Sequence, residues 1–193
     1  MVNQKAKAND SFMSSLKDSI IMITNPAAIL KKKMQGVSWQ VALIIPGSAF
    51  SLFFLQTGID LFRNGSIGLI RVVLMGLLGV IYGTIGVTGL SIICFFITKS
   101  MGTTKDMKWA ISTFAMGYSG TLVYAVTGLI FSSLLGWNTA VAFGVTGVLW
   151  ALRPMMATIR HMTNGNATIG VILSTICGTI LLFGWALLSQ LGV

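Results

Sequence analysis

The sequence predicts an all-α integral membrane protein, with five transmembrane helices preceded by short amphipathic helices at the membrane interface. Hydrophobic residues make up 54% of the 193 residues and charged residues only 9%, and the mean hydropathy is +0.86. A soluble globular domain carries about 25% charged residues. Because so few charges cannot cover a surface that faces water, lipid is the expected solvent for most of the chain.

The N-terminal part divides into residues 1–11, which are polar and expected to be disordered, and residues 12–36, which carry a helical pattern. Apolar side chains recur there every three or four residues, as on one helix face: Phe12, Leu16, Ile20 and Ile23. Pro26 is expected to open a second short helix. That helix runs into a basic cluster, which consists of Lys31, Lys32 and Lys33. The pattern predicts segments that lie on the anionic headgroups of the inner leaflet, with a solvated helical hairpin as the alternative.

Five apolar segments make up most of the remaining chain, residues 37–193, and each reaches the roughly 20 residues that a membrane helix needs. They lie at about 39–61, 67–98, 109–135, 139–159 and 169–191. The second segment is longer than a straight crossing requires, so we expect it to tilt or kink. The connections are short, and none is long enough for a soluble domain.

Basic residues lie unevenly about these spans, and cytoplasmic loops are enriched in them. If the N-terminus is cytoplasmic, all 13 lysines and arginines except Arg63 and Arg71 lie at or near the inner face. We therefore expect a multi-pass protein of the cytoplasmic membrane with an extracytoplasmic C-terminus. The net charge of +9 then belongs to membrane loops, and we expect no nucleic-acid partner. Four tryptophans lie near span ends, where interfacial anchors are found: Trp39, Trp109, Trp137 and Trp185.

The side chains that carry out catalysis are scarce. The chain has no glutamate, four aspartates and one histidine, His161, which we expect to be solvated in a cytoplasmic turn. Cys94 and Cys177 lie in apolar segments without metal-ligand spacing, so we expect them to pack as small hydrophobic residues. The sequence therefore predicts neither enzymatic activity nor a metal or cofactor.

Ionisable residues at membrane depth are candidates for function. Asp60 ends the first span, Arg63 follows three residues later, and Arg71 begins the second span. These charges either form a functional site or balance one another at the outer rim, and we favour the rim. Arg153 lies about 10 Å deeper than Arg160 at 1.5 Å per residue. It either extends to the inner headgroups, which we favour, or lines a polar cavity.

Four glycines of the second span share one predicted helix face: Gly76, Gly79, Gly83 and Gly86. Each costs about 1 kcal/mol relative to alanine in a soluble helix, but in lipid such a face lets another helix approach closely. Gly117 and Gly120 of the third span offer a matching surface. We therefore predict that the second span is the central, most tightly packed helix, and a packing role between subunits or with another membrane protein stays open.

Three short sequence segments, each next to a predicted span, follow one another along the chain. KKKMQGVSWQ follows Asn25-Pro26 and enters the first span, KSMGTTKDMKW leads to ISTFAMGYSGTLVYAVTGLI, and IRHMTNGNATIGVIL opens the last span. In this order, residues 12–190 resemble the Yip-domain family, five-span membrane proteins named for binding Ypt/Rab GTPases in eukaryotes. The resemblance implies a role in membrane traffic and no catalytic residues. The short N-terminus, without the proline-rich region of eukaryotic members, is more similar to the compact bacterial members.

These observations together predict a non-enzymatic membrane scaffold or adaptor for partner membrane proteins or lipids. A small transporter or channel component for a neutral or anionic solute is the alternative. A lipid-modifying enzyme is the third possibility, and the scarcity of carboxylates and histidines argues against it.

Overall fold

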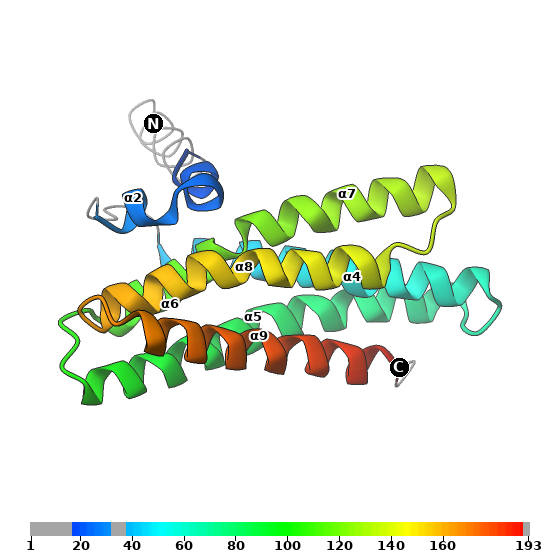
Figure 1. Ribbon diagram of the computed structural model, residues 1–193. Helices are drawn as coiled ribbons and strands as arrows, with labels where there is room; N and C mark the ends of the chain where they lie inside the picture. Colours follow the sequence, from blue (N-terminus) through cyan, green and yellow to red (C-terminus); the bar gives the residue numbers. More distant parts are fainter. Residues whose placement is uncertain (1–16, 32–37, 191–193) are drawn as a thin grey trace, which may run out of the picture.

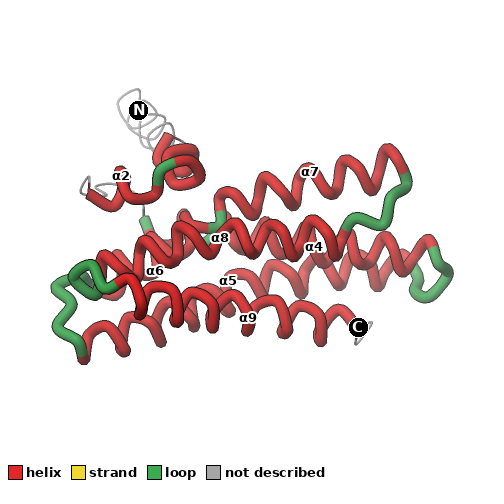
Figure 2. Tube along the Cα trace, viewed as in Figure 1, coloured by secondary structure: helices red, strands yellow, loops and turns green. Residues whose placement is uncertain are grey.

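The computed structural model describes residues 17–31 and 38–190, and within these ranges the chain forms helices and no strand (Figure 1, Figure 2). The five spans contain α3 (Trp39–Ala42) with α4 (Ile44–Arg63), α5 (Leu69–Ser100), α6 (Met107–Gly117) with α7 (Ser119–Leu135), α8 (Ala140–Met162) and α9 (Ala167–Gln190). All five are long and apolar enough to cross a membrane, which confirms the predicted class of all-α membrane protein. Residues 17–24 and α2 (Pro26–Lys31) are helical and precede them.

The bundle has two ends that differ in charge. The connections at 101–106 and 163–166 lie together at one end, which we call the basic end because Lys99, Lys105 and Arg160 belong to it. The connections at 64–68 and 136–139 lie at the other end together with the end of α9, and we call this the far end (Figure 1).

The third span is two helices, whereas the sequence predicted one helix over 109–135. Tyr118 interrupts the helix with φ −84° and ψ 5°, and its N–H bonds to the Ala115 carbonyl three residues back at 3.1 Å. Such a tight turn changes the direction of the chain. As a result, α7 takes a different direction from α6 and packs on α4 and α8, whereas α6 lies inside the bundle against α3, α5 and α8 (Figure 1).

Helix α4 lies at the centre of the bundle and packs against α5, α6, α7, α8 and α9. Its side chains Phe50, Phe53 and Phe54 are fully buried in the main core. Helix α5 packs mainly on α4 and exposes a broad apolar face that includes Ile70, Ile81 and Ile85. The prediction that the second span is the central helix is therefore wrong, because one face of α5 is left for lipid.

Helix α6 lies between two hydrophobic cores. Ala110, Phe114 and Tyr118 follow one another at four-residue spacing and pack in the main core. Ile111, Ala115 and Met116 point the other way, into a second core. Every residue from Ala110 to Gly117 is buried as a result.

The second core is completed by residues 17–31, which we call the N-terminal layer. Met22 and Leu30 of this layer are buried against the α6 side chains, and α2 packs on α8. The predicted apolar stripe is only partly correct, because Ile20 is 56% exposed. Phe12, Leu16, Lys32 and Lys33 lie outside the described residues, and Lys31 ends α2. The interfacial position of the layer stays a prediction.

Candidate functional site

Polar side chains gather at the far end, where α4, α7 and α8 meet. Gln56, Asp60 and Arg63 lie on one stripe of α4, four and three residues apart, and helical neighbours at these spacings share a face. Ser132 of α7 and Thr139, which precedes α8, complete what we call the polar cluster. Sequence reasoning found Asp60 and Arg63 but missed the other three. A glutamine one helical turn before an aspartate, inside an apolar span, was the signal available for Gln56.

Gln56 is fully buried and ties the three helices together. Its amide nitrogen donates to the Ala125 carbonyl of α7 at 2.8 Å. The Thr139 hydroxyl donates to the Gly128 carbonyl at 2.9 Å and lies 3.4 Å from the Gln56 amide oxygen. Gly128 makes room for this contact, because a Cβ there would lie 2.5 Å from that oxygen. In lipid these polar groups have no water to bond, so the bonds hold the helices in register.

Arg63 binds the C-terminal part of α7. Its guanidinium donates to the Ser132 hydroxyl at 3.2 Å and to the Ser132 carbonyl at 2.7 Å. The Ser132 carbonyl also accepts the Gly136 N–H at 3.1 Å, and the carbonyls at the C-terminal end of a helix carry partial negative charge. A cation placed there therefore stabilises the end of α7. The guanidinium is turned to α7 instead of pairing directly with Asp60.

Asp60 lies at the N-terminus of α8, where the Ala140 backbone N–H faces its carboxylate. Thr139 occupies the N-cap position but makes no side-chain cap bond, since its hydroxyl is engaged with Gly128. Asp60 supplies the missing negative charge at this helix start from another helix. Its Oδ1 is buried and has no hydrogen-bond partner among the described residues.

The charges do not balance one another directly, as the favoured interpretation of the rim expected. Asp60 and Arg63 each meet a helix end of opposite polarity instead. Arg71 lies outside the polar cluster, with its side chain exposed in the first turn of α5. Arg153 is exposed on the outer surface of α8, while its neighbour Pro154 is buried. This position is the one from which an arginine extends toward headgroups.

The glycines of α5 meet α4, not the third span. A Cβ on Gly79 would lie 2.5 Å from the Phe50 carbonyl oxygen, and one on Gly83 would overlap the Pro46 carbonyl oxygen. A Cβ on Gly76 would lie 2.8 Å from the Leu55 side chain. The two backbones are thus close enough that only glycine fits at 79 and 83.

The remaining predicted packing glycines have other neighbours. A Cβ on Gly86 would lie 3.2 Å from the Leu181 side chain of α9, so Gly86 does not share the α4 face. Gly117 lies against Pro154, and Gly120 lies against the Trp150 ring, both on α8. The predicted match between the α5 glycines and Gly117–Gly120 is therefore wrong, because α4 and α8 occupy the two surfaces.

His161 belongs to the last turn of α8 instead of a solvated turn. Its ring lies 5.7 Å from the Trp109 ring, and Lys105 Nζ lies 5.2 Å from the centre of the Trp109 ring. These three side chains form a stack at the basic end that fixes the start of α6 against the end of α8.

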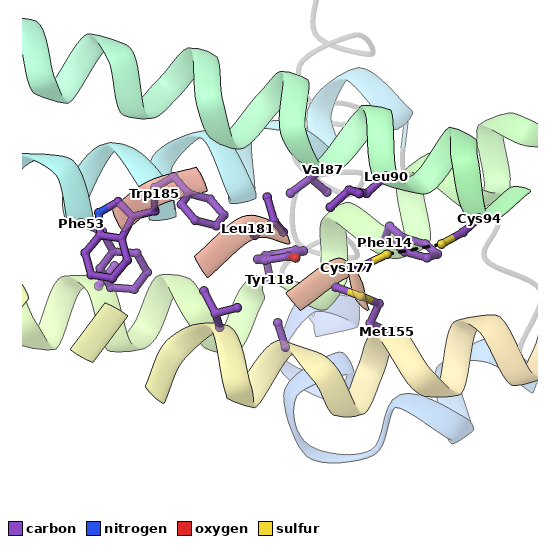
Figure 3. Packing of buried hydrophobic residues seen from close by; sticks show 14 of the residues in the cluster. Phe53, Val87, Leu90, Cys94, Phe114, Tyr118, Met155, Cys177, Leu181 and Trp185 are labelled. Atoms are coloured by element: carbon purple, nitrogen blue, oxygen red, sulfur yellow. Dashed lines mark hydrogen bonds between the residues drawn. The ribbon is translucent and has the colours of Figure 1, made fainter. Parts of the chain in front are cut away.

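The middle of the bundle is filled by large side chains (Figure 3). Tyr118 is fully buried there, and its hydroxyl has no hydrogen-bond partner among the described residues. Cys94 and Cys177 are free and buried, as expected, with their sulfur atoms 3.5 Å apart. Trp185, predicted as an interfacial anchor, packs its side chain into the core beside Phe53 and does not turn it toward lipid (Figure 3).

Within residues 17–31 and 38–190, no group of three or more histidine, cysteine, aspartate or glutamate side chains gathers as a metal site would require. No protein-family model, no curated protein and no solved structure matches this chain. The protein is a polytopic α-helical membrane protein, and its resemblance to the Yip-domain family stays a prediction from the sequence.

Proposed function

We propose that the protein is a non-enzymatic membrane scaffold or adaptor, and that its N-terminal layer is the surface that binds a partner membrane protein. The observation that carries this proposal is the way the layer is built. Met22 and Leu30 anchor it in the second core, whereas Lys17, Ile20 and Thr24 remain exposed on it. A short segment held rigidly by one face and exposed on the other suits recognition.

The interior supports the same proposal. The polar side chains of the far end bond to neighbouring helices, as Gln56 and Arg63 do. Between the polar cluster and the basic end, the bundle is packed with Phe50, Phe53 and Tyr118. Polar side chains that bond to neighbouring helices favour a structural role of the protein over a chemical one.

The proposal places the basic end, and with it the N-terminal layer, in the cytoplasm, following the distribution of lysine and arginine. Anionic lipid headgroups at this end and a second copy of the chain or another membrane protein are the proposed partners. The adaptor role is also what the resemblance to Yip-domain proteins implies.

A photo-crosslinking amino acid placed at Thr24 in the native membrane tests the role of the layer. The same probe at Leu187, which is 63% exposed on α9, is the matched control for contacts with lipid and with passing proteins. We expect one defined protein adduct from position 24 that position 187 does not give. An Ile20→Asp variant should reduce this adduct while leaving the thermal stability unchanged. Identical adducts at both positions, or an adduct indifferent to Ile20→Asp, would refute the adaptor proposal.

One observation favours the transporter alternative, namely the buried Oδ1 of Asp60 that lacks a partner. A carboxylate at this depth is a candidate for solute binding. Purified protein in liposomes would then move a neutral or anionic solute, and Asp60→Asn would abolish the flux. The scaffold proposal predicts that solute release equals that of protein-free liposomes.

A further inference from the structure

A pocket of about 430 Å³ opens at the far end between α4, α8 and α9. Its walls include Val141 and Val145 of α8 and Leu182 of α9, and Thr57 and Ser189 also line it. An apolar pocket with a few polar groups is the usual form of a small-molecule site. The pocket is separate from the polar cluster and from the N-terminal layer.

Trp185 lines this pocket and carries a buried donor with no acceptor. Its side chain is only 5% exposed, and the indole Nε1 has no hydrogen-bond partner among the described residues. The benzene edge of the indole is fixed against α8, where a Cβ on Gly144 would lie 2.5 Å from it. In Figure 3 the indole nitrogen lies on the side of the residue turned away from Tyr118, toward the far end where the pocket opens.

Three other polar residues line the pocket, namely Thr57, Ser189 and Gln190, and the two hydroxyls donate within their own helices. The Thr57 hydroxyl donates to the Phe53 carbonyl at 3.0 Å, and the Ser189 hydroxyl donates to the Ala186 carbonyl at 2.9 Å. Leaving a buried N–H without an acceptor costs free energy, and such groups are rare in folded proteins. None of these groups accepts a hydrogen bond from the indole nitrogen, so an acceptor that enters the pocket from outside the chain would remove this cost.

The depth of Trp185 indicates which acceptor this is. It lies five residues before the end of α9 at Gln190, or about 7.5 Å at 1.5 Å per residue. α9 is about 36 Å long by the same rise, a few ångströms longer than a hydrocarbon core of about 30 Å. With α9 centred on the hydrocarbon core, Trp185 would lie a few ångströms inside the core boundary, near the level at which glycerolipids carry their ester carbonyls.

We propose that this pocket binds one acyl chain of a glycerolipid, with an ester carbonyl of that lipid accepting a hydrogen bond from Trp185 Nε1. The apolar walls contact the acyl chain, and the hydrogen bond from the indole sets the depth of the lipid in the membrane. This site goes beyond the adaptor role, because it concerns a lipid at the far end and not a protein at the basic end. The two proposals can fail independently.

Tryptophan fluorescence tests the site directly. Two single-tryptophan proteins, one keeping Trp185 and one keeping Trp150, are placed in nanodiscs containing an ester phospholipid brominated on its acyl chains. Trp150 is 44% exposed on α8, so bulk lipid should quench it in proportion to the brominated fraction. Trp185 is shielded from bulk lipid, and we expect at least a twofold loss of its fluorescence that saturates at a low brominated fraction. Quenching of Trp185 by less than a tenth would overturn the proposal.

Pocket-filling variants distinguish a bound chain from bulk lipid. Val145→Phe should abolish the quenching of Trp185 and leave that of Trp150 unchanged, and Ala186→Leu serves if Val145→Phe does not fold. Unlabelled ester phospholipid should restore Trp185 fluorescence at several-fold lower concentration than its diether analogue, which lacks the carbonyl. Quenching that survives both filling variants, or equal displacement by the ester and ether lipids, would overturn the proposal.

Discussion

Helices α5 and α6 are neighbours in sequence and opposite in environment. α5 has 32 residues and touches the bundle along a narrow stripe centred on Gly79 and Gly83. α6 has 11 residues, of which Ala110–Gly117 are all buried between two cores. The richer glycine pattern belongs to the outer helix, and the shorter, more polar helix lies inside.

The difference shows that glycine spacing and burial report different properties in a membrane bundle. A glycine stripe shows that one face approaches a backbone closely, but the rest of that helix is free to face lipid, as Ile81 and Ile85 do. Burial on all sides instead accompanies small and weakly polar side chains such as Ser112 and Thr113, whose hydroxyls bond to carbonyls four residues back.

The largest effect is expected from breaking the α5 contact with α4. In Gly83→Ala the new methyl group meets the backbone carbonyl of Pro46, and a backbone cannot move aside as a side chain does. We expect a loss of about 3 kcal/mol, at the upper end of overpacking penalties, measured by thermal or SDS unfolding in detergent. Gly89→Ala is the control, because no atom lies within 4 Å of a Cβ at that position. Equal stability of the two variants would rule out the close approach.

An intermediate effect is expected from overfilling the outer side of α6. Ala115 is fully buried in the second core, so Ala115→Leu should cost about 2 kcal/mol. It should also loosen the N-terminal layer, which limited proteolysis of residues 17–31 would detect as faster cleavage. Val123→Leu on the exposed face of α7 should change neither measurement. If both variants resist protease like the parent protein, α6 does not contact the layer.

The smallest effect, a gain in stability instead of a loss, is expected from a substitution of Tyr118, which packs in the main core. The Tyr118 hydroxyl is buried without a partner, so Tyr118→Phe removes a polar group that has lost its water. We expect an unchanged or higher unfolding temperature, equivalent to a gain of up to about 1 kcal/mol. A destabilisation of 2 kcal/mol or more would show that the hydroxyl has a partner in the membrane.

Much of the fold follows from the sequence, because hydropathy over about 20 residues depends only on local composition. The five spans appear within a few residues of their predicted bounds. The break at Tyr118 was not predicted, although Gly117, Ser119 and Gly120 surround it, because small residues are also common in continuous membrane helices. The partner of the α5 glycines could not be deduced either, because spacing defines a face but not the helix that meets it.

The candidate site likewise has a part that the sequence predicts and a part that only the tertiary structure shows. Asp60 and Arg63 were found because charge stands out in an apolar span. Their partners Ser132 and Ala140 belong to other helices, so only the tertiary structure brings them together. The burial of Trp185 depends on Gly144 of α8, which no pattern within α9 indicates.

The N-terminal layer is part of the bundle in this structure, and a disulfide crosslink tests this contact directly. Leu30 of α2 and Ala157 of α8 line the same pocket at the basic end. In a Cys94→Ala, Cys177→Ala background, Leu30→Cys with Ala157→Cys should crosslink rapidly under mild oxidation in the membrane. The pair Ile20→Cys with Ala157→Cys should not, because Ile20 points away from the bundle. Failure of the Leu30 pair, or equal crosslinking of both pairs, would contradict a layer packed on α6 and α8.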